Sequence, residues 1–308
     1  IYGKYTLDNL INFSQKCDIL TYEFENIDID ILKKIQKPIY PDIKYLEIIQ
    51  DKLIQKDFLT SNNFNVGSYS ILNKKEDLDT FIKKYDFPII IKKRRGSFDG
   101  RGNELIKNNT DLNDWIYNNE SKIKNYYVEN YINFNSEISI CGCKSNQKVH
   151  YYEPVKNIHK NNILIKTEYN QNNIIENNKS KIKNIFQNLL NLFNTKGVVC
   201  CEFFEDNNNI YLNEIALRVH NTYHISLDCC NISQFELHLL SILDLNIPQL
   251  KFIRNGFMYN IISNLQTRED ILNEYEKIKW EYYLKIKNYN KKPIGIRKIG
   301  HINFIKNL

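Results

Sequence analysis

Proline, glycine and methionine are scarce in this sequence, with only 6, 10 and 1 of them among 308 residues. Collagen-like chains and Pro/Gly-rich disordered chains are therefore excluded, because both need far more of the first two. No apolar run approaches the ~20 residues that cross a bilayer as a helix, which excludes a helical membrane protein. The opening residues, Ile1–Asp8, lack the regions of a secretory signal and do not begin with methionine. We therefore expect a cytoplasmic protein and a sequence that is a fragment or a processed piece of a longer chain.

Cysteine is present, but without the spacing of disulfide or zinc frameworks. The seven cysteines are an odd number, and six of them form three close pairs in apolar runs. The pairs are Cys141/Cys143, Cys200/Cys201 and Cys229/Cys230. None shows the repeated C-x₂-C spacing of a structural zinc site. We expect buried thiols in a reducing compartment.

What is present is an ordinary globular composition with a modest positive charge. Hydrophobic residues make up 42% of the chain and charged residues 25%, and the formal net charge is +6. The lysines are spread along the chain instead of clustered, so this charge does not indicate a nucleic-acid partner. The length of 308 residues allows two or three lobes and a sizeable core.

Helix and strand patterns alternate along the chain, which is typical of an α/β or α+β fold. The first three elements are a helix at Leu7–Gln15, a strand at Cys17–Asn26 and a short helix at Asp30–Ile35. Together they indicate the end of a βαβ unit. The strand and the glycine-rich turn that would open such a unit do not occur in the sequence before them.

The same patterns predict the later elements. A single helix is expected over Asp42–Leu59 after a turn between Pro38 and Pro41, and short strands are expected through 250–308. Ser233 followed by Glu236 predicts a capped helix start. The other predicted helices are Asp77–Lys84, Asp111–Tyr117 and Ile182–Phe193, and the other strands are Phe87–Lys92, Tyr126–Ile132, Glu137–Gly142, Val149–Val155, Asn162–Lys166, Gly197–Phe204 and Asn209–Leu212.

Three of the ten glycines fall close together, at Gly96, Gly100 and Gly102. They lie among basic residues between two predicted strands, shortly after Lys92. Glycine lets backbone N–H groups approach a phosphate closely, so one interpretation is a hairpin flap over a nucleotide. The other is an ordinary hairpin turn, because the loop matches neither the P-loop nor the dinucleotide-binding pattern.

A second polar segment, Asn213–His224, follows a predicted strand and combines carboxylate, amide, guanidinium and imidazole groups. Asn213 and Glu214, with Glu202 on the preceding strand, offer oxygen ligands that suit Mg²⁺, which proteins often hold through a few carboxylates and substrate phosphates. The alternative is a charged strand end whose side chains pair with one another. His159, in a predicted loop between two strands, is by itself more typical of a structural histidine.

Taken together, separated segments resemble the N5-carboxyaminoimidazole ribonucleotide synthases, ATP-grasp enzymes of purine biosynthesis. The matching segments occur in the order of the family and span almost the whole chain. They are Cys17–Asn26, Gln50–Lys52 with Lys56, Lys92 with Phe98–Asn103, Asn133–Ser139, Asn157–His159, Asn213–Asn221, Ser233–His238 and Arg297–His301.

The resemblance implies an ATP-grasp fold of the α/β (α+β) class. Residues 1–48 would be a doubly wound preATP-grasp domain that lacks its first strand and glycine-rich turn, 49–247 the ATP-grasp domain, and 248–308 a small β-rich domain. The implied enzyme is a C–N ligase that carboxylates 5-aminoimidazole ribonucleotide with bicarbonate through carboxyphosphate, giving ADP and phosphate. Its cofactors would be ATP and Mg²⁺, with Mn²⁺ as the alternative. It would form a homodimer and act with N5-carboxyaminoimidazole ribonucleotide mutase.

The family motifs also imply roles for individual residues. The catalytic residues would be Arg218, His220 and Lys92, the first two facing bicarbonate and the acceptor amine. Glu202, Glu214 and Asn213 would hold the metal. Lys291, Arg297 and Lys298 would bind the 5′-phosphate of the ribonucleotide. The nucleotide site would be formed by Lys52, Lys56, Lys92, Ser97, Phe98, Asp99, Gly100, Arg101, Gly102, Asn103, Glu129, Asn130, Tyr131, Ile132, Glu137, His159, Asn213 and Glu214.

The chain departs from the family pattern at a few of these motifs. Lys52 stands where the family usually has arginine, Leu217 where it has proline and Tyr223 where it has glycine. A glycine suggests tight packing or an unusual backbone conformation, so the ring of Tyr223 must go elsewhere. Within the segment Asn213–His224, we expect Leu217 and Tyr223 to lower the efficiency of the enzyme most.

Two other interpretations stand beside this one. The first is another ATP-grasp ligase of purine synthesis, the formate-dependent glycinamide ribonucleotide transformylase, which a test of formate against bicarbonate would separate. The second is a non-catalytic ATP-binding fragment, which would bind Mg·ATP without substrate-dependent release of ADP.

Overall fold

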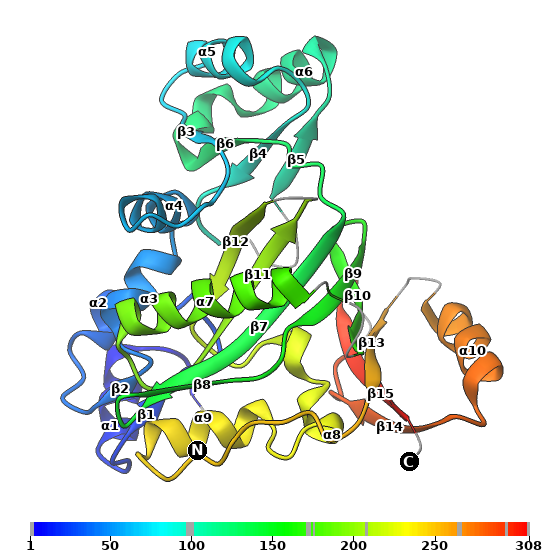
Figure 1. Cartoon of the computed structure of the whole chain (residues 1–308). Coiled ribbons are helices and arrows are strands. Elements are labelled where there is room, and N and C mark those ends of the chain that lie inside the picture. Colours follow the sequence, from blue (N-terminus) through cyan, green and yellow to red (C-terminus); the bar gives the residue numbers. More distant parts are fainter. Residues whose placement is uncertain are drawn as a thin grey trace.

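The computed structural model describes residues 3–96, 102–170, 174, 176–206, 209–263, 267–292 and 295–306. These residues form a four-stranded sheet, a nine-stranded sheet and a two-stranded sheet, with helices on their faces (Figure 1). The predicted mixture of helices and sheets is confirmed. Five residues of the predicted nucleotide site lie outside the described residues, namely Ser97, Phe98, Asp99, Gly100 and Arg101.

The N-terminal segment contains α1 (Leu7–Ser14), β1 (Leu20–Thr21), α2 (Ile29–Leu32) and β2 (Ile39–Tyr40), and β1 pairs with β2 in parallel. The two predicted helices are confirmed. The predicted strand at Cys17–Asn26 is wrong in length, because only two of its residues pair with a neighbour. Its partner β2 lies between Pro38 and Pro41, where a turn was predicted, and proline has no N–H with which to extend the ladder.

The helix predicted over Asp42–Leu59 is two helices, α3 (Ile43–Ile49) and α4 (Lys52–Ser61). Asp51 separates them. Its backbone is extended, and its side chain accepts hydrogen bonds from the N–H groups of Leu53 and Ile54 at 3.1 and 3.4 Å. Asp51 therefore caps a new helix, as aspartate commonly does.

The four-stranded sheet is antiparallel throughout, with the order β3-β6-β4-β5. Helices α5 (Glu76–Tyr85) and α6 (Asn109–Asn119) lie at the top of Figure 1, and their buried Leu78 and Trp115 pack with Ile91 and Val128 of the sheet. The strands are β3 (Tyr69–Ile71), β4 (Ile89–Lys93), β5 (Asn103–Ile106) and β6 (Tyr126–Asn130), and the short helix η1 (Glu120–Asn125) precedes β6. The predicted helices, and the predicted hairpin between β4 and β5, are confirmed.

The nine-stranded sheet has the order β12-β11-β7-β9-β10-β13-β15-β14, with β8 paired to β7. Its strands are β7 (Ser136–Ser145), β8 (Lys148–Tyr151), β9 (Val155–Lys160), β10 (Ile163–Tyr169), β11 (Val198–Glu205), β12 (Ile210–Ala216), β13 (Gly256–Ile262), β14 (Tyr282–Asn288) and β15 (Lys298–Lys306). The pairing of β10 with β13 continues the sheet into the region after 248. His159 lies on β9, so its predicted place in a loop is wrong.

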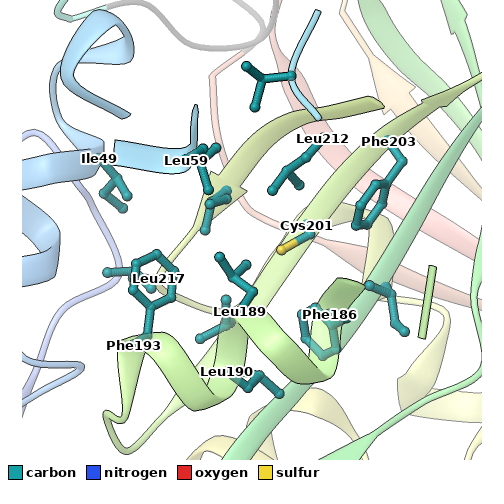
Figure 2. Close-up of a cluster of buried hydrophobic side chains, with 14 of the residues drawn as sticks. Ile49, Leu59, Phe186, Leu189, Leu190, Phe193, Cys201, Phe203, Leu212 and Leu217 are labelled. Carbon is teal, nitrogen blue, oxygen red and sulfur yellow. The ribbon is translucent and has the colours of Figure 1, made fainter. Parts of the chain in front are cut away.

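Strands β7 and β11 are largely buried on both faces, which explains the almost continuous apolar sequence of β11. On one face Ile140 and Cys201 belong to the core under α7 (Glu176–Phe193) (Figure 2). On the other face Cys141 and Cys200 pack with residues of α8 (Ser226–Cys229) and α9 (Gln234–Ile242). The three cysteine pairs are buried and all seven thiols are free, as predicted.

Helix α9 begins with the predicted capping box, in which Ser233 and Glu236 bond reciprocally. Helix α10 (Thr267–Ile278) was not predicted, because 250–308 was interpreted as short strands only. Its apolar residues Ile271, Tyr275 and Ile278 recur at helical spacing and pack on β13 and its neighbours. Among the described residues, no helix is both long and apolar enough to cross a membrane.

Candidate active site

The four-stranded sheet lies above β11 and β12 in Figure 1, and some of the predicted site residues are in contact in this region. Two contacts reach β12 there, one from the four-stranded sheet and one from α4. The ammonium of Lys92 on β4 lies 3.3 Å from Oδ1 of Asn213 on β12. The ammonium of Lys52 at the start of α4 lies 3.3 Å from Oε2 of Glu214. Structural elements that are far apart in the sequence therefore present two cations to an amide and a carboxylate.

A β-bulge within β12 directs the side chains of Asn213 and Glu214. Glu202 on β11 pairs with Glu214, and the next pair is Phe203 with Leu212. Asn213 is therefore an extra residue on β12, and such bulges re-aim the neighbouring side chains. The bulge gathers one amide and two carboxylates at a single corner of the sheet.

The two carboxylates at this corner differ in electrostatic environment. Burial raises the pKa of Glu202 to about 7, and the charge of Glu214 adds to the effect although His159 opposes it. Burial also acts on Glu214, but the charge and hydrogen bond of Lys52 outweigh it and hold the pKa of Glu214 below its ordinary value. Two adjacent carboxylates and an amide suit a hard cation such as Mg²⁺. Among the described residues, no cluster of three or more His, Cys, Asp and Glu side chains could hold a metal ion, so a cation here would also need substrate oxygens.

Behind this corner, the buried carboxylate of Glu129 holds two lysines. Its oxygens lie 2.8 Å from the ammonium of Lys92 and 3.3 Å from that of Lys56, and the hydroxyl of Tyr127 donates to it at 2.7 Å. Burial raises the pKa of Glu129, but the two lysines outweigh this and lower it to about 2. Burial lowers the pKa of Lys56 to about 8, and its ammonium also donates to the carbonyl of Val66. Two ammonium groups and one carboxylate leave a net positive charge, which suits phosphate.

Asp51 joins the start of α4 to the base of the β4–β5 hairpin. Its carboxylate accepts hydrogen bonds from Arg94 at 2.8 and 3.1 Å and from Arg95 at 3.2 Å. The backbone N–H of Lys52 donates to the carbonyl of Arg94 at 2.9 Å. Asp51 was not predicted as a site residue. Its position before a helix could have indicated the cap, but not the two arginines.

Two glycines of the described part of the hairpin have the left-handed backbone that favours glycine. Gly96 has φ of 70° and Gly102 has φ of 83°. Asn103 opens β5 opposite Lys92. The hairpin geometry suits both a flap and an ordinary turn, and the residues that would distinguish them lie among 97–101.

The segment from Glu129 to Ile132 leads from the four-stranded sheet toward β7. Asn130 is held by Ser68, whose N–H donates to its side chain at 2.8 Å and whose carbonyl accepts from its backbone at 3.0 Å. Ile132 packs so closely on Gly67 that a Cβ there would lie 3.0 Å from it. The side chain of Tyr131 is 39% exposed. The segment is therefore held against Gly67 and Ser68 at the connection between the sheets.

Glu137 and His159 form an ion pair between β7 and β9. Burial lowers the pKa of His159, but the hydrogen bond and charge of Glu137 outweigh it and raise the pKa above its ordinary value. The charge of Glu202 acts in the same direction. The structure thus brings His159 and Glu137 to the side of the sheet that carries the carboxylate corner.

Arg218 and Leu217 follow β12 and face the N-terminal segment through Glu25. The Arg218 Nε lies 3.4 Å from Glu25 Oε1, and the backbone N–H of Leu217 donates to the same oxygen at 3.2 Å. The family's proline at this position could not make the second bond, because proline has no N–H. Glu25 was not predicted as a site residue, although it lies in the matching segment Cys17–Asn26. The feature of the sequence that could have indicated a role for Glu25 is its position near the end of a predicted strand.

His220 lies between Arg218 and the carboxylate corner. Its Nδ1 is 2.9 Å from Oγ1 of Thr222 and 3.9 Å from a carboxylate oxygen of Glu202. Burial, together with the positive charges of Arg218 and Lys298, lowers the pKa of His220 well below its ordinary value. The ring is therefore neutral near pH 7.

The basic residues predicted to bind a phosphate lie on the connection from β14 to β15 and at the start of β15. The charges of Lys298 and Lys291 both lower the pKa of His224, which places them on its side of the molecule. Lys291 also lies 5.2 Å from the centre of the Tyr289 ring. Arg297 is exposed, and its position relative to a substrate stays a prediction.

The ring of Tyr223 goes into the core between the sheet and α9. Tyr223 belongs to the short helix η2 (Asn221–Tyr223), is fully buried, and is not among the residues with positive φ. Its hydroxyl donates to the carbonyls of Ser139 at 3.1 Å and Glu153 at 2.8 Å. The ring lies 5.5 Å from that of Tyr152. The substitution is therefore accommodated by packing and hydrogen bonds.

Comparisons with known proteins give a consistent result. Residues 57–235 match the family model described as an ATP-grasp domain. The N5-carboxyaminoimidazole ribonucleotide synthase of Staphylococcus aureus (strain MRSA252) is 32% identical over 315 residues, which cover 100% of this chain and 81% of that protein.

Two solved structures are similar along the whole chain. The N5-carboxyaminoimidazole synthetase from Staphylococcus aureus complexed with ADP has a TM-score of 0.88 and 30% identity, covering 100% of this chain and 82% of that one. The N5-carboxyaminoimidazole synthase from Aspergillus clavatus, in complex with ADP and 5-aminoimidazole ribonucleotide, has a TM-score of 0.87 and 25% identity, covering 98% of this chain and 81% of that one.

Proposed function

The chain belongs to the N5-carboxyaminoimidazole ribonucleotide synthase family of ATP-grasp enzymes, and we propose that it uses ATP to carboxylate 5-aminoimidazole ribonucleotide with bicarbonate. The products are ADP, phosphate and N5-carboxyaminoimidazole ribonucleotide, an intermediate of purine biosynthesis. The observation that supports this reaction best is the contact between Lys92 and Asn213. In our assignment the cation of Lys92 binds phosphate, and the amide of Asn213 with the carboxylates of Glu202 and Glu214 binds a metal. Arg218 lies on the following segment.

The chemistry calls for positioning and charge neutralisation more than for a covalent nucleophile. An oxygen of bicarbonate attacks the terminal phosphorus of ATP, the bond to ADP breaks, and carboxyphosphate forms. Lys92 and Lys52 are the groups that we assign to the phosphates. Mg²⁺ or Mn²⁺, held by Glu202, Glu214 and Asn213, would neutralise phosphate charge when bound.

The second step transfers the carboxyl group to the acceptor. The exocyclic amine of the ribonucleotide bonds to the carboxyl carbon and gives up one proton, while the bond from that carbon to the phosphate oxygen breaks and phosphate leaves. The planar guanidinium of Arg218 can hold a carboxylate or phosphate through two parallel hydrogen bonds, and its contact with Glu25 fixes its direction. His220 is neutral and lies between Arg218 and Glu202, so we assign it to the acceptor side.

A substrate comparison tests the reaction directly. ADP release should require both bicarbonate and 5-aminoimidazole ribonucleotide, and formate with glycinamide ribonucleotide should not replace them. Release with the formate pair would favour the transformylase. ATP binding without release under either condition would favour a non-catalytic ATP-binding protein.

We assign the nucleotide to the space between the two sheets. The connecting segment Glu129–Ile132 would contact adenine, and the pair of Glu137 with His159 would lie at the ribose. The β4–β5 hairpin would cover the phosphates. The basic residues Lys291, Arg297 and Lys298 would bind the 5′-phosphate of the acceptor.

We also propose a cytoplasmic homodimer that passes its product to a mutase. Seven free thiols support a reducing compartment. Helix α9 and its C-cap residue Leu243 present an apolar stripe on which Phe235, Leu239 and Leu243 are 37%, 52% and 50% exposed. Because the three recur every four residues, two copies of the helix could pack against each other. Leu239→Glu should then convert a dimer to a monomer in light scattering, and a wild-type monomer would contradict the dimer.

A further inference from the structure

Gln234, the first residue of α9, makes two hydrogen bonds of opposite polarity with the backbone of His220. Its side chain is fully buried. Its Oε1 accepts from the N–H of His220 at 2.8 Å, and its Nε2 donates to the carbonyl of His220 at 2.8 Å. An N–H can only donate and a carbonyl can only accept, so these partners fix which end of the amide is oxygen.

The same amide determines the protonation of His224. The Gln234 Nε2 also lies 3.0 Å from Nδ1 of His224. Because this nitrogen can only donate, Nδ1 must be the acceptor. The proton of the neutral ring is therefore on Nε2. Burial, followed by the positive charges of His301 and Lys298, lowers the pKa of His224 to about 3, so the ring is neutral near pH 7.

Packing holds this ring in one orientation. The ring of His301 stacks on it at 4.8 Å, and the ring of Phe235 stacks at 5.7 Å. The carbonyl of His224 accepts a hydrogen bond from Asn303 at 3.1 Å. The hydroxyl of Tyr289 lies 2.7 Å from Nδ1 of His301, which holds the stacking partner in turn.

The surroundings of the ring are positively charged. Arg218, Lys291 and Lys298 all act on it electrostatically. A neutral ring among three cations, with its proton on the nitrogen that Gln234 does not contact, is suited to donate a hydrogen bond to an oxyanion. It is poorly suited to accept one from an amine.

We propose that Gln234 is a positioning residue that makes His224 a neutral Nε2–H donor to an oxyanion of the substrates, while it holds the backbone of His220. The oxyanion belongs either to the 5′-phosphate of the acceptor or to bicarbonate. This inference rests on the proposed function. No role of its own was predicted from the sequence for either residue, although His224 ends the polar segment Asn213–His224 and Gln234 lies in the matching segment Ser233–His238.

The tautomer can be measured without any activity. Long-range ¹H–¹⁵N spectra of the full chain, with His224 assigned by its loss in His224→Gln, should show a neutral ring protonated at Nε2 near pH 7. In Gln234→Glu the side chain has the same shape but cannot donate to Nδ1, so the proton should move to Nδ1. A wild-type ring protonated at Nδ1, or at both nitrogens, would overturn the proposal.

Two substitutions of His224 distinguish the roles of its two ring nitrogens. The amide nitrogen of glutamine can occupy the place of Nε2, whereas asparagine reaches only the place of Nδ1. His224→Asn should raise the KM of one oxyanion substrate by about tenfold, as expected for one lost hydrogen bond to a charged group. His224→Gln should retain most of the affinity, and the KM of ATP should stay unchanged in both. A higher KM of the ribonucleotide would identify its 5′-phosphate as the oxyanion, and a higher KM of bicarbonate would identify bicarbonate.

The proposal would be contradicted if the KM of the oxyanion substrate rose equally in the two variants, or rose less in His224→Asn. Either result would show that the ring does not act through Nε2. Gln187→Glu is the matched control, because Gln187 on α7 donates to the hydroxyl of Tyr151 and lies outside the site. It should change neither the tautomer nor any KM. If Gln234→Glu does not fold, the proposal is tested by the wild-type spectrum and by the KM values of the two His224 variants. If the wild type releases no ADP, the proposed function fails, while the tautomer is still measured by the spectra.

Discussion

At the scale of single residues, Lys56 shows how burial changes the role of a side chain. It was predicted to contact ATP, and that role stays a prediction. The structure places its ammonium against Glu129 and the carbonyl of Val66, with only 2% of the residue exposed. In this position its charge balances Glu129, which also holds Lys92.

Replacing Lys56 by methionine should therefore destabilise the protein. The change leaves Glu129 buried with one cation instead of two, and breaking a buried ion pair costs about 3 kcal/mol. Urea unfolding near neutral pH measures the loss. Lys33→Met is the control, because it removes an exposed pair with Glu47, and such pairs contribute little. Equal stability of the Lys56 variant and the wild type would show that the pair is not needed.

Glu214→Gln should abolish ADP release that depends on bicarbonate and the ribonucleotide. The amide keeps the shape of the side chain but removes the charge that faces Lys52 and would face a metal. We expect a loss of at least about a hundredfold, the scale seen when one group that stabilises transition-state charge is removed. Steady-state assays measure it, with Glu47→Gln as a surface control. Normal turnover would mean that the metal assignment is wrong.

The sequence predicts Lys56 and Glu214 as site residues because their types and order follow a family pattern. It could not show the partners of Glu25, Asp51 and Gln234. Each of these acts through a contact with a residue that the fold brings near, such as Arg218 for Glu25. The bulge at Asn213 could not be predicted from the sequence either, because only the register of β11 against β12 shows that β12 has an extra residue.

At the scale of elements, Asp51 connects the start of α4 to the base of the β4–β5 hairpin. Asp51→Asn should keep the helix cap, because asparagine caps as well as aspartate. It should lose the ion pairs with Arg94 and Arg95, so the hairpin and Lys52 should be held less firmly over the phosphates.

We expect the KM of ATP to rise by about tenfold in this variant, which corresponds to ~1.4 kcal/mol. The KM of the ribonucleotide should not change. Asp51→Ala removes the cap as well and should lower the stability further, by about 1 kcal/mol. An unchanged KM of ATP in Asp51→Asn would show that the arginine contacts do not position the nucleotide site.

Most elements could be predicted because their patterns are local. The helices α5, α6 and α7 have apolar residues at helical spacing, and Ser233 with Glu236 marks the start of α9. The wrong predictions of elements have local causes as well. Asp51 breaks a long helical pattern, and the strand at Cys17–Asn26 is limited by the length of its partner between two prolines.

At the scale of the whole molecule, His238 joins three parts of the chain. Its Nδ1 accepts from the N–H of Val198 on β11 at 3.1 Å, so its Nε2 carries the proton and donates to Thr21 on β1 at 2.7 Å. The residue itself lies on α9 and is buried. The bond from Val198 exists only while the ring is neutral, because a protonated Nδ1 can no longer accept it.

The stability of the protein should therefore depend on pH through His238. Burial lowers the pKa of His238 from 6.5 to about 4 in the folded state. The contribution of the neutral ring is then fully present above pH 6.5 and is lost as the pH falls toward 4. The difference corresponds to about 3 kcal/mol. Urea unfolding of wild type and His238→Gln across this range should show their difference shrinking as the pH falls. A constant difference would contradict this role.

The order of strands in the nine-stranded sheet also has a consequence for how the protein is synthesised. β9 and β10 are consecutive in the chain, so β10 can pair with β9 once both have left the ribosome. The other edge of β10 pairs with β13, which emerges after α7, β11, β12 and α9. The corner at Glu202 and Glu214 can thus form on a nascent chain before β15 brings Lys298. Until β13 arrives, the free edge of β10 offers unpaired N–H and C=O groups to any other strand. During translation this edge is the place where mispairing with a neighbouring nascent chain should begin.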